Sequence, residues 1–145
     1  MMFIQKPSGF NSKFDVVSCF LEHEGRFLLL HRSDSENEGN RWGAPAGKVE
    51  KGEDLLDAAT RELFEETGIT LRKERLRYWG KTFVRYPKFD FVYHIYSTEH
   101  LGGPQIKINL KEHKNFRWVT PTEALAMPLM MDEDTSIKLF YKLMQ

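Results

Sequence analysis

Three glutamates at helical spacing form the densest group of chemically useful side chains in the sequence: Glu62, Glu65 and Glu66. On a helix each residue advances by about 100°, so Glu65 and Glu66 both lie within about 60° of Glu62. Like charges at this spacing repel one another and lower helix stability. A cation relieves that repulsion, and carboxylate oxygens suit hard divalent metals such as Mg²⁺ and Mn²⁺. The spacing therefore indicates a metal site, with a solvated acidic face as the alternative.

Neighbouring residues favour the metal site over the acidic face. Gly47 and Gly52 predict a tight loop just before the helix, whose backbone can approach a ligand closely. Arg61 directly precedes Glu62 and can orient the carboxylates around a metal. On their own, these residues predict a metal site without specifying a reaction.

The complete segment 47–69, GKVEKGEDLLDAATRELFEETGI, resembles the Nudix box G-x5-E-x7-R-E-U-x-E-E-x-G-U, where U is aliphatic. Every defined position matches, namely Gly47, Glu53, Arg61, Glu62, Leu63, Glu65, Glu66, Gly68 and Ile69. The flanks are also similar to the family, in the lead-in at 41–47, the strand that ends at Arg32 and the later segment 112–119. The resemblance therefore covers most of the chain.

The resemblance implies an α/β (α+β) fold of the Nudix type. This fold is an αβα sandwich, in which a mixed sheet carries a central box helix and a C-terminal helix. The resemblance also implies an Mg²⁺-dependent pyrophosphohydrolase, with Mn²⁺ as a substitute metal. Such an enzyme cleaves a nucleoside diphosphate linked to another group X, by attack of water on phosphorus. We expect a small nucleotide substrate, such as a (d)NTP or a nucleotide sugar.

The family pattern also implies a role for individual residues. The expected metal ligands are the Gly47 carbonyl and the side chains of Glu62, Glu65 and Glu66. Arg61 and Glu53 are expected to hold the loop and the helix together, and Gly68 belongs to the motif as the helix stop. The general base is expected at Glu66 or Glu65, and otherwise at Glu112. Glu112 could instead be a further metal ligand or an exposed loop carboxylate.

Substrate contacts follow less directly from the sequence. Trp42 could stack on a base, and Arg32 or Arg85 could meet a phosphate. Further candidates for the substrate site are Phe83 and Tyr86. Tyr86 resembles a marker of diadenosine-polyphosphate hydrolases, whereas the adjacent Pro87 resembles one of ADP-ribose hydrolases, so the two markers point in different directions. A core position for Trp42 and a surface position for Arg32 are the alternatives.

Hydrophobic periodicity and turn residues predict the elements that must position these side chains. The Glu24-Gly25 turn predicts a hairpin. The predicted strands are Phe14–Leu21, Arg26–Arg32, Leu76–Tyr86, Phe89–Ser97 and Asn115–Val119, and the predicted helices are Glu53–Thr67, Pro121–Ala126 and Asp132–Met144. Ser33–Arg41 is predicted to be a surface loop, and Cys19 a small buried hydrophobe.

Composition limits the class of protein. The 145 residues fit one domain, 1–145, and 21 Lys+Arg balance 21 Asp+Glu. A neutral chain argues against a nucleic-acid-binding role, because proteins that wrap nucleic acid carry a basic excess. No apolar run approaches the roughly 20 residues of a membrane span, so no membrane association is expected. A single cysteine, Cys19, fits a reducing compartment, and we expect a cytoplasmic protein.

Other functions and partners remain open from the sequence. An isopentenyl-diphosphate isomerase shares the fold, but those enzymes use a catalytic cysteine, and Cys19 lies far upstream of the box. A non-catalytic nucleotide-binding module usually lacks box glutamates, and none is missing here. Hydrolysis of a dinucleoside polyphosphate or of ADP-ribose is a further alternative, RNA decapping has little support, and the resemblance allows a homodimer.

The neutral total conceals a division of charge along the chain. Glu50–Glu66 holds seven acidic and two basic residues, whereas Thr67–Gln145 holds thirteen basic and eight acidic residues. This division suits an acidic metal-binding patch beside a basic segment that meets phosphate, and it also suits a solvated basic surface.

Overall fold

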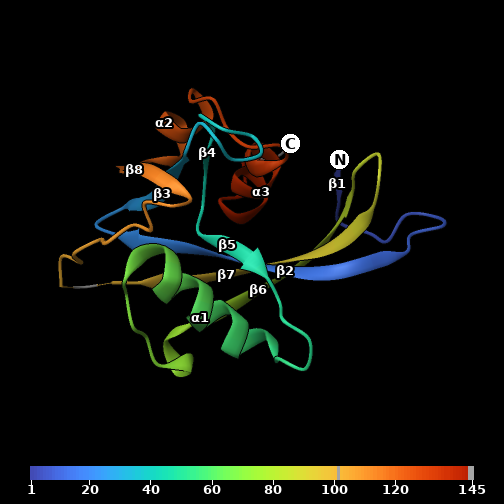
Figure 1. Cartoon of the computed structure of the whole chain (residues 1–145), viewed down its shortest axis with the longest axis horizontal. Helices are drawn as coiled ribbons and strands as arrows, with labels where there is room; N and C mark the ends of the chain where they lie inside the picture. Colours follow the sequence, from blue (N-terminus) through green and yellow to red (C-terminus); the bar gives the residue numbers. More distant parts are fainter. Residues whose placement is uncertain (101, 144–145) are drawn as a thin grey trace.

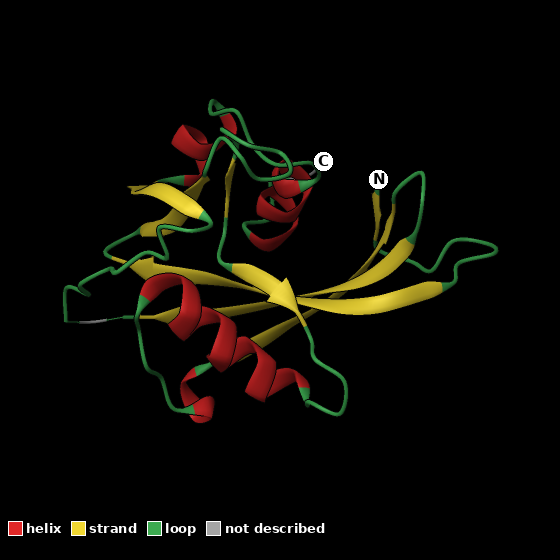
Figure 2. Ribbon diagram, viewed as in Figure 1, coloured by secondary structure: helices red, strands yellow, loops and turns green. Residues whose placement is uncertain are grey.

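The structure, a computed structural model, describes residues 1–100 and 102–143. It consists of a mixed β-sheet with helices on both faces (Figures 1 and 2). The elements in chain order are β1 (Met2–Phe3), β2 (Ser12–His23), β3 (Arg26–Arg32), β4 (Trp42–Gly43), β5 (Ala46–Lys48), α1 (Leu55–Thr67), the 3-10 turn η1 (Lys73–Arg75), β6 (Arg77–Arg85), β7 (Asp90–Glu99), β8 (His113–Val119), α2 (Pro121–Leu125) and α3 (Glu133–Phe140).

The sheet is mixed because one central pair is parallel. Its strand order is β1-β6-β7-β2-β3-β4, with β5 also pairing with β2 and β8 with β3. Strands β2 and β7 run parallel over a long register, from Asp15↔Val92 to Glu22↔Glu99. The remaining pairs are antiparallel. The chain between β2 and β7 contains α1, which is the kind of crossover that a parallel pair requires.

The predicted hairpin forms, but it is short. Only Glu22↔Phe27 and His23↔Arg26 pair across the turn between β2 and β3. Beyond them β3 leaves β2 and pairs with β8 and β4. The vacated edge of β2 instead receives β5, through Val16↔Lys48, Val17↔Gly47 and Ser18↔Ala46. This divergence places the segment 42–48 next to the centre of the sheet.

Helix α1 begins and ends at residues that act as caps. The Asp54 side chain accepts a hydrogen bond from the Asp57 N–H at 2.8 Å, so the helix starts at Leu55, two residues later than predicted. Gly68 adopts φ 77°, and its N–H donates to the Phe64 carbonyl. A left-handed residue at this position is best supplied by glycine, which makes Gly68 the helix stop that the motif predicted.

The C-terminal helix is shorter than predicted. Helix α3 ends at Phe140, whereas the periodicity predicted a helix to Met144. Lys142 has φ 58°, and this left-handed conformation cannot continue an α-helix. Met144 itself lies outside the described residues. The spacing of Ile137, Phe140 and Tyr141 is therefore correct for packing, but it did not locate the end of the helix.

Two apolar cores, one on each face of the sheet, confirm the αβα sandwich. The first packs α1 through Ala58, Ala59 and Leu63 against β2 and β3, and it includes the buried Cys19. The second packs α2 and α3 through Ala124 and Ile137 against the opposite face. None of the helices in the described ranges has the length and hydropathy of a membrane span.

Candidate active site

Gly47 allows Glu62 to approach the backbone of β5. A Cβ atom at Gly47 would overlap the Glu62 carboxylate. The Glu62 side chain is 15% exposed. Burial raises its pKa, although Arg61 opposes this effect, and the charges of Glu65 and Glu112 raise the pKa further. The structure therefore brings the carboxylate of Glu62, a predicted ligand, against the backbone of Gly47, whose carbonyl is another predicted ligand.

Arg61 joins the loop after β5 to helix α1. Its Nε and Nη2 donate to Glu53 Oε2 and Oε1 at 2.8 and 2.9 Å, and Nη2 also donates to the Lys48 carbonyl at 3.1 Å. This bidentate pairing with Arg61 lowers the pKa of Glu53 to about 2. Arg61 Nη1 donates to Glu62 Oε1 at 2.8 Å and to Glu65 Oε2 at 3.3 Å. The link from Glu53 to Arg61 is the one that the motif predicted.

Glu66 is the most buried of the three clustered glutamates, with 5% exposure. Its Oε2 accepts a hydrogen bond from the Ala46 N–H at 3.1 Å. Burial raises the pKa of Glu66 well above its usual range, and the charges of Glu62 and Glu112 add to the effect. One backbone donor does not compensate a buried carboxylate, so this group would gain from a nearby cation.

Glu112 and Arg32 come from other segments of the chain and lie close enough to act electrostatically on Glu62 and Glu66. The Glu112 charge raises the pKa of Glu62 and Glu66, and the Arg32 charge lowers that of Glu66. The Glu112 carbonyl accepts from the Ser33 N–H at 2.9 Å, which ties the loop before β8 to the end of β3. Arg32 Nε donates to the Asn37 carbonyl at 2.8 Å. The fold thus adds a fourth carboxylate and a guanidinium to the cluster.

The donor chemistry of this cluster fits a hard divalent cation. Glu62, Glu65, Glu66 and the Gly47 carbonyl are all oxygen donors. Beyond the effect of burial, the charge of Glu65 raises the pKa of Glu62, and the charge of Glu62 raises that of Glu66. Within residues 1–100 and 102–143, however, no three acidic, histidine or cysteine side chains converge in a ready metal cage. Two of the carboxylates, those of Glu62 and Glu65, instead accept hydrogen bonds from Arg61 Nη1.

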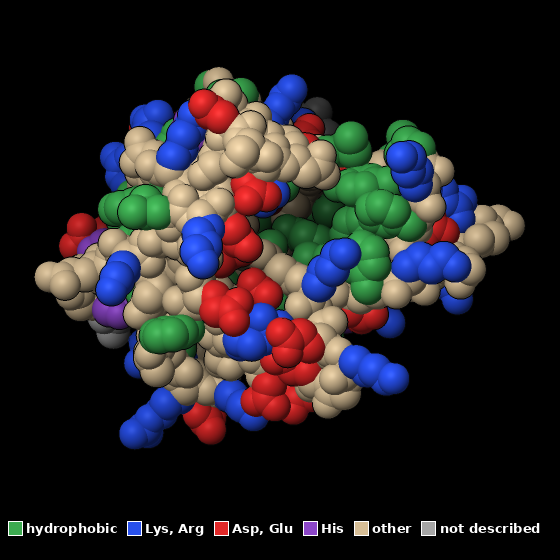
Figure 3. All heavy atoms as spheres, viewed as in Figure 1, with side chains coloured by type: hydrophobic (Ala, Val, Ile, Leu, Met, Phe, Trp, Pro, Cys, Tyr) green, Lys and Arg blue, Asp and Glu red, His purple; other side chains and the backbone are tan. Residues whose placement is uncertain are grey.

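A cavity of about 280 Å³ opens beside this carboxylate cluster. One end is lined by Arg32, Ala46, Gly47 and Lys48. The other residues that line it are mostly apolar or aromatic and include Val84, Tyr86, Phe91, Tyr93, Met130 and Met131, together with Asp132 and Glu133. In Figure 3 a hollow with hydrophobic walls lies next to a cluster of acidic side chains on the same face. A charged end and an apolar body suit a ligand with a phosphate and a ring.

The family follows from comparison with known proteins. A family model described as the NUDIX domain matches residues 12–140. This chain belongs to the Nudix hydrolase family. Phosphatase NudJ of Escherichia coli (strain K12) is 39% identical over 66 residues, a match that covers 43% of this chain and 42% of NudJ. The match thus spans less than half the length of this curated relative.

Solved structures of other Nudix proteins share the fold. A MutT protein from Methanosarcina mazei Go1 is 25% identical with a TM-score of 0.78, over 90% of this chain and 94% of that protein. The NUDIX domain of Shewanella oneidensis NrtR, complexed with ADP ribose, is 19% identical with a TM-score of 0.76, over 97% and 95%. An Ap4A hydrolase from C. elegans is 22% identical with a TM-score of 0.72, over 90% and 96%.

The predicted substrate residues occupy different places relative to this Nudix site. Arg32 and Tyr86 line the cavity, and burial raises the pKa of the Tyr86 phenol to about 12. Trp42 is 8% exposed, stacks on His31 with ring centroids 4.1 Å apart, and is not among the cavity-lining residues. Arg85 pairs with Asp90 at 3.0 Å and lines a separate shallow surface hollow. The fold therefore brings only two of these residues to the cavity.

Phe83 also lies away from the cavity. Its ring packs edge-on against Phe10, with centroids 5.3 Å apart. On β6 it alternates with Val84, which does line the cavity, and successive side chains of a strand point to opposite faces. The same alternation separates Phe83 and Arg85 from the cavity.

Glu133 is a residue of this site that the sequence did not single out. It lies at the start of α3, is 6% exposed, lines the cavity, and accepts a hydrogen bond from the Ala44 N–H at 2.6 Å. Burial raises its pKa to about 7. In the sequence it belongs to an acidic run at 132–134 that resembles an ordinary helix start, and no local signal separates it from its neighbours.

Proposed function

We propose that this chain hydrolyses the diphosphate linkage of a small nucleotide, such as a (d)NTP or a nucleotide sugar, with Mg²⁺ or Mn²⁺ as cofactor. The products would be the two phosphorylated fragments on either side of the cleaved anhydride. Support comes from membership of the Nudix family and from a complete Nudix box.

The residues of the box and its surroundings would have separate roles in this reaction. Glu62, Glu65, Glu66 and the Gly47 carbonyl would hold the metal, and Glu112 would supply a further carboxylate from the loop before β8. When bound, the metal would offset phosphate charge and lower the pKa of water. Glu66 or Glu65, and otherwise Glu112, would accept the proton from the attacking water. Arg61 would hold the carboxylates in register, and Arg32 would meet the substrate phosphates at the cavity mouth.

One observation carries the proposal, namely the buried Glu66 carboxylate, which is bound by the N–H of Ala46 in the cavity wall. Burying a carboxylate to 5% exposure with a single backbone hydrogen bond is unfavourable for folding. Beside it lie Glu62 and a glycine that a side chain could not replace without displacing that glutamate. A purely structural helix has no use for this arrangement, whereas a metal-dependent hydrolase does.

A substrate panel tests the proposal. Nucleoside triphosphates, nucleotide sugars, dinucleoside polyphosphates, ADP-ribose and capped RNA would be incubated with the protein and Mg²⁺ or Mn²⁺, and products would be separated by ion-exchange chromatography. We expect turnover of at least one class and none with EDTA. Turnover of no compound by protein with a cooperative thermal transition would reject the hydrolase and favour a nucleotide-binding module without catalysis.

A dinucleoside polyphosphate is the second candidate substrate. Tyr86 lines the cavity, and its ring lies edge-on to Phe91 with centroids 5.2 Å apart. The face of an aromatic ring beside a phosphate site could stack a second base. In the panel, a dinucleoside polyphosphate cleaved faster than the corresponding triphosphate would favour this candidate.

A further inference from the structure

Three side chains form a hydrogen-bonded triad on the face of the sheet that carries α1. The Tyr78 hydroxyl on β6 lies 2.9 Å from His94 Nδ1 on β7, and His94 Nε2 lies 2.7 Å from Asp15 Oδ2 on β2. His94 is 5% exposed, whereas Tyr78 is 49% exposed. None of these three residues lines the cavity beside the metal-ligand cluster. The Asp15–His94–Tyr78 triad therefore runs from a carboxylate through a buried imidazole to a phenol that solvent reaches.

The chemistry of the three groups fixes the direction of both hydrogen bonds. A carboxylate only accepts, so His94 Nε2 carries a proton and donates to Asp15. A neutral imidazole has one N–H, which leaves Nδ1 as an acceptor, and the Tyr78 hydroxyl donates to it. The phenol proton is thus already directed at a base.

Two irregularities of the sheet bring the ends of the triad to His94. The pairing of β2 with β7 shifts register just before Asp15, and the pairing of β6 with β7 shifts just after Tyr78. Each of the two residues lies opposite a position of β7 two residues from His94, namely Val92 or Tyr96, and so reaches the imidazole diagonally. Bulges are common next to active sites, where they redirect a side chain.

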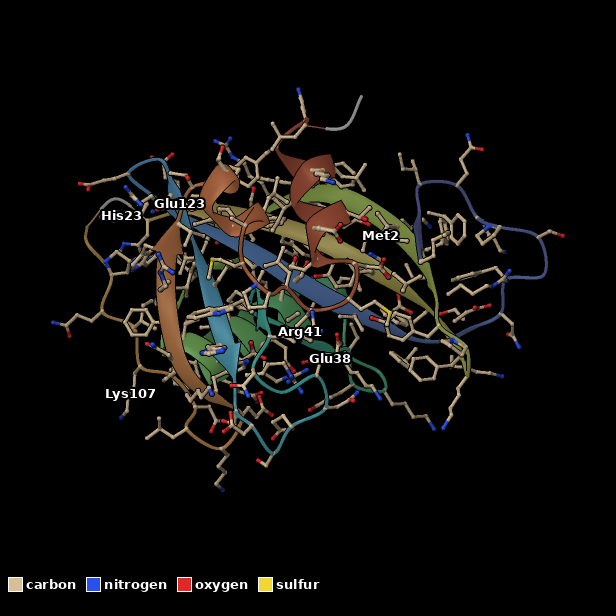
Figure 4. All side chains as sticks on the ribbon, turned by 90° about the horizontal axis from the view of Figure 1, so that it is seen from above. Met2, His23, Glu38, Arg41, Lys107 and Glu123 are labelled. Atoms are coloured by element: carbon tan, nitrogen blue, oxygen red, sulfur yellow. The ribbon has the colours of Figure 1, made fainter. Side chains whose placement is uncertain are left out.

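The triad lies beside the loop that leads into α1. Figure 4 shows α1 on the far side of the sheet from α2 and α3, and in Figure 1 strands β2 and β6 continue past its N-terminal end. The Asp15 carbonyl accepts from the Val49 N–H of this loop at 2.9 Å. The Tyr78 ring packs on that of Tyr96, with centroids 5.1 Å apart. Both ends of the triad are therefore held in place, while the phenol stays half-exposed.

Negative charge lies close to the phenol. Partial burial, and after it the charge of Asp15, raise the pKa of Tyr78 above its usual value. Burial and Tyr78 likewise raise the pKa of Tyr96, and the charge of Asp54 adds to this effect. Lys81 shares this face of β6, but its ammonium lies over the next aromatic ring of the strand, 5.9 Å from the centroid. An anionic phosphoryl donor is therefore repelled here, and an uncharged electrophile is favoured.

We propose that Tyr78 is a nucleophile that accepts an acyl group from an uncharged aryl ester, with His94 as its general base and Asp15 as the residue that orients the imidazole. A nucleophile bonded to a base that a third group orients is the signature of covalent catalysis. Tyr78 Oη would attack the ester carbonyl carbon while its proton passes to His94 Nδ1. The bond to the aryl oxygen would then break, and this oxygen would take the proton from His94. The products are an acyl ester of Tyr78 and a free phenol, and the step is independent of the proposed hydrolysis.

Acetylation by p-nitrophenyl acetate tests this assignment, with EDTA present so that no metal-dependent reaction contributes. N-acetyltyrosinamide in the same solution supplies the reactivity of a phenol without a neighbouring base. Peptide mass spectrometry would follow acetylation of Tyr78 from pH 8.5 to 9.5 in the wild type, His94→Gln and Asp15→Asn. Glu24→Gln is the matched control, because Glu24 is a carboxylate in the β2–β3 turn with 83% exposure.

We expect Tyr78 to be acetylated at least tenfold faster than N-acetyltyrosinamide in the wild type and in Glu24→Gln, with less than a twofold rise over this pH range. Without the base only the phenolate reacts, and the pKa of Tyr78 is raised, so the rate in His94→Gln should fall below that of the reference and rise almost tenfold with pH. Asp15→Asn should lose at least fivefold, because an amide that donates to Nε2 favours the tautomer whose Nδ1 cannot accept a proton.

A structural pair of hydrogen bonds around a buried histidine is the alternative, and it predicts no enhanced reactivity. A wild-type rate no greater than that of N-acetyltyrosinamide would overturn the assignment, as would unchanged rates and pH profiles in the variants. Thermal unfolding would show that each variant is folded. If His94→Gln does not fold, Asp15→Asn gives the answer, since the Asp15 side chain is 43% exposed.

Discussion

At the residue scale, burial and charge conflict most directly at Glu66. Its carboxylate receives the Ala46 N–H at 3.1 Å, yet burial and the charge of Glu62 raise its pKa well above the usual range. Burial with one backbone donor makes the charged form of this group unfavourable. A group that is unfavourable for folding and placed beside a cavity is best explained by a function that needs its charge.

The substitution Glu66→Gln therefore separates stability from activity. Glutamine keeps an acceptor for Ala46 and removes the charge, so we expect an unchanged or higher Tm. Without the carboxylate, kcat should fall by at least 100-fold, or about 2.7 kcal/mol in activation free energy. Calorimetry and steady-state kinetics on the best substrate of the panel would measure both quantities. Glu50→Gln is the control, since Glu50 is 69% exposed and lies 3.8 Å from Arg61. Near-normal activity of Glu66→Gln would remove Glu66 from any catalytic role.

Gly47 offers a second test at this scale, because its missing side chain makes room for a carboxylate. In Gly47→Ala the new methyl group must displace the end of the flexible Glu62 side chain, which costs the fold little. Metal affinity should drop by at least tenfold, as measured by Mn²⁺ titration with electron paramagnetic resonance. In Gly102→Ala the added methyl would lie 3.8 Å from His100 Cε1, an ordinary contact, and Gly102 lies outside the box, so the metal affinity of this variant should match the wild type. Equal affinities in both variants would mean that Glu62 is not a ligand.

At the element scale, the sequence predicted the parts of the site that are close in the chain. The Nudix box lies on one loop and one helix, so residue spacing alone placed Glu62, Glu65 and Glu66 together. Glu133 was missed because 89 residues separate it from Ala44, and only the packing of α3 on the segment 42–48 brings them together. The end of α3 was also misplaced, because a left-handed residue at Lys142 stops the helix while the apolar spacing continues.

We expect the contact between α3 and the segment 42–48 to make the free energy of unfolding depend on pH. Burial raises the pKa of Glu133 from 4.5 to about 7, so the folded chain binds an extra proton between those values. The free energy of unfolding should therefore fall as pH rises through this window, by about 3 kcal/mol for this group. Urea denaturation from pH 4.5 to 8 would show the wild type losing this amount relative to Glu133→Gln. Asp134→Asn should show a smaller loss than the wild type, because the Asp134 charge contributes to the raised pKa of Glu133. Curves for the wild type and Glu133→Gln that run parallel would show that Glu133 does not titrate in this window.

At the scale of the whole molecule, charge is divided rather than absent. The chain is neutral overall, but Glu50–Glu66 holds seven acidic and two basic residues, and the acidic side chains gather beside the hollow (Figure 3). Trp42 and Arg85 were candidates for substrate contact in the sequence, and both pack away from the cavity. Trp42 stacks on His31, and Arg85 lies on the other face of β6 and pairs with Asp90. Contact of these two residues with substrate stays a prediction, whereas Arg32 and Tyr86 have the position for it.

Removal of the metal should lower the Tm of the whole chain, because the clustered carboxylates then repel one another without a cation between them. A cation that binds only the folded state raises the free energy of unfolding by about 2.7 kcal/mol at 100 times its dissociation constant. For a chain of this length that corresponds to an increase in Tm of about 8 °C. We expect this shift in scanning calorimetry with Mg²⁺ or Mn²⁺, its reversal by EDTA, and less than half of it in Glu66→Gln. Potassium chloride at equal ionic strength is the control, because salt screens exposed charges without filling a carboxylate site. An equal shift in potassium chloride, or an undiminished one in Glu66→Gln, would mean that the acidic cluster is a solvated surface and not a metal site.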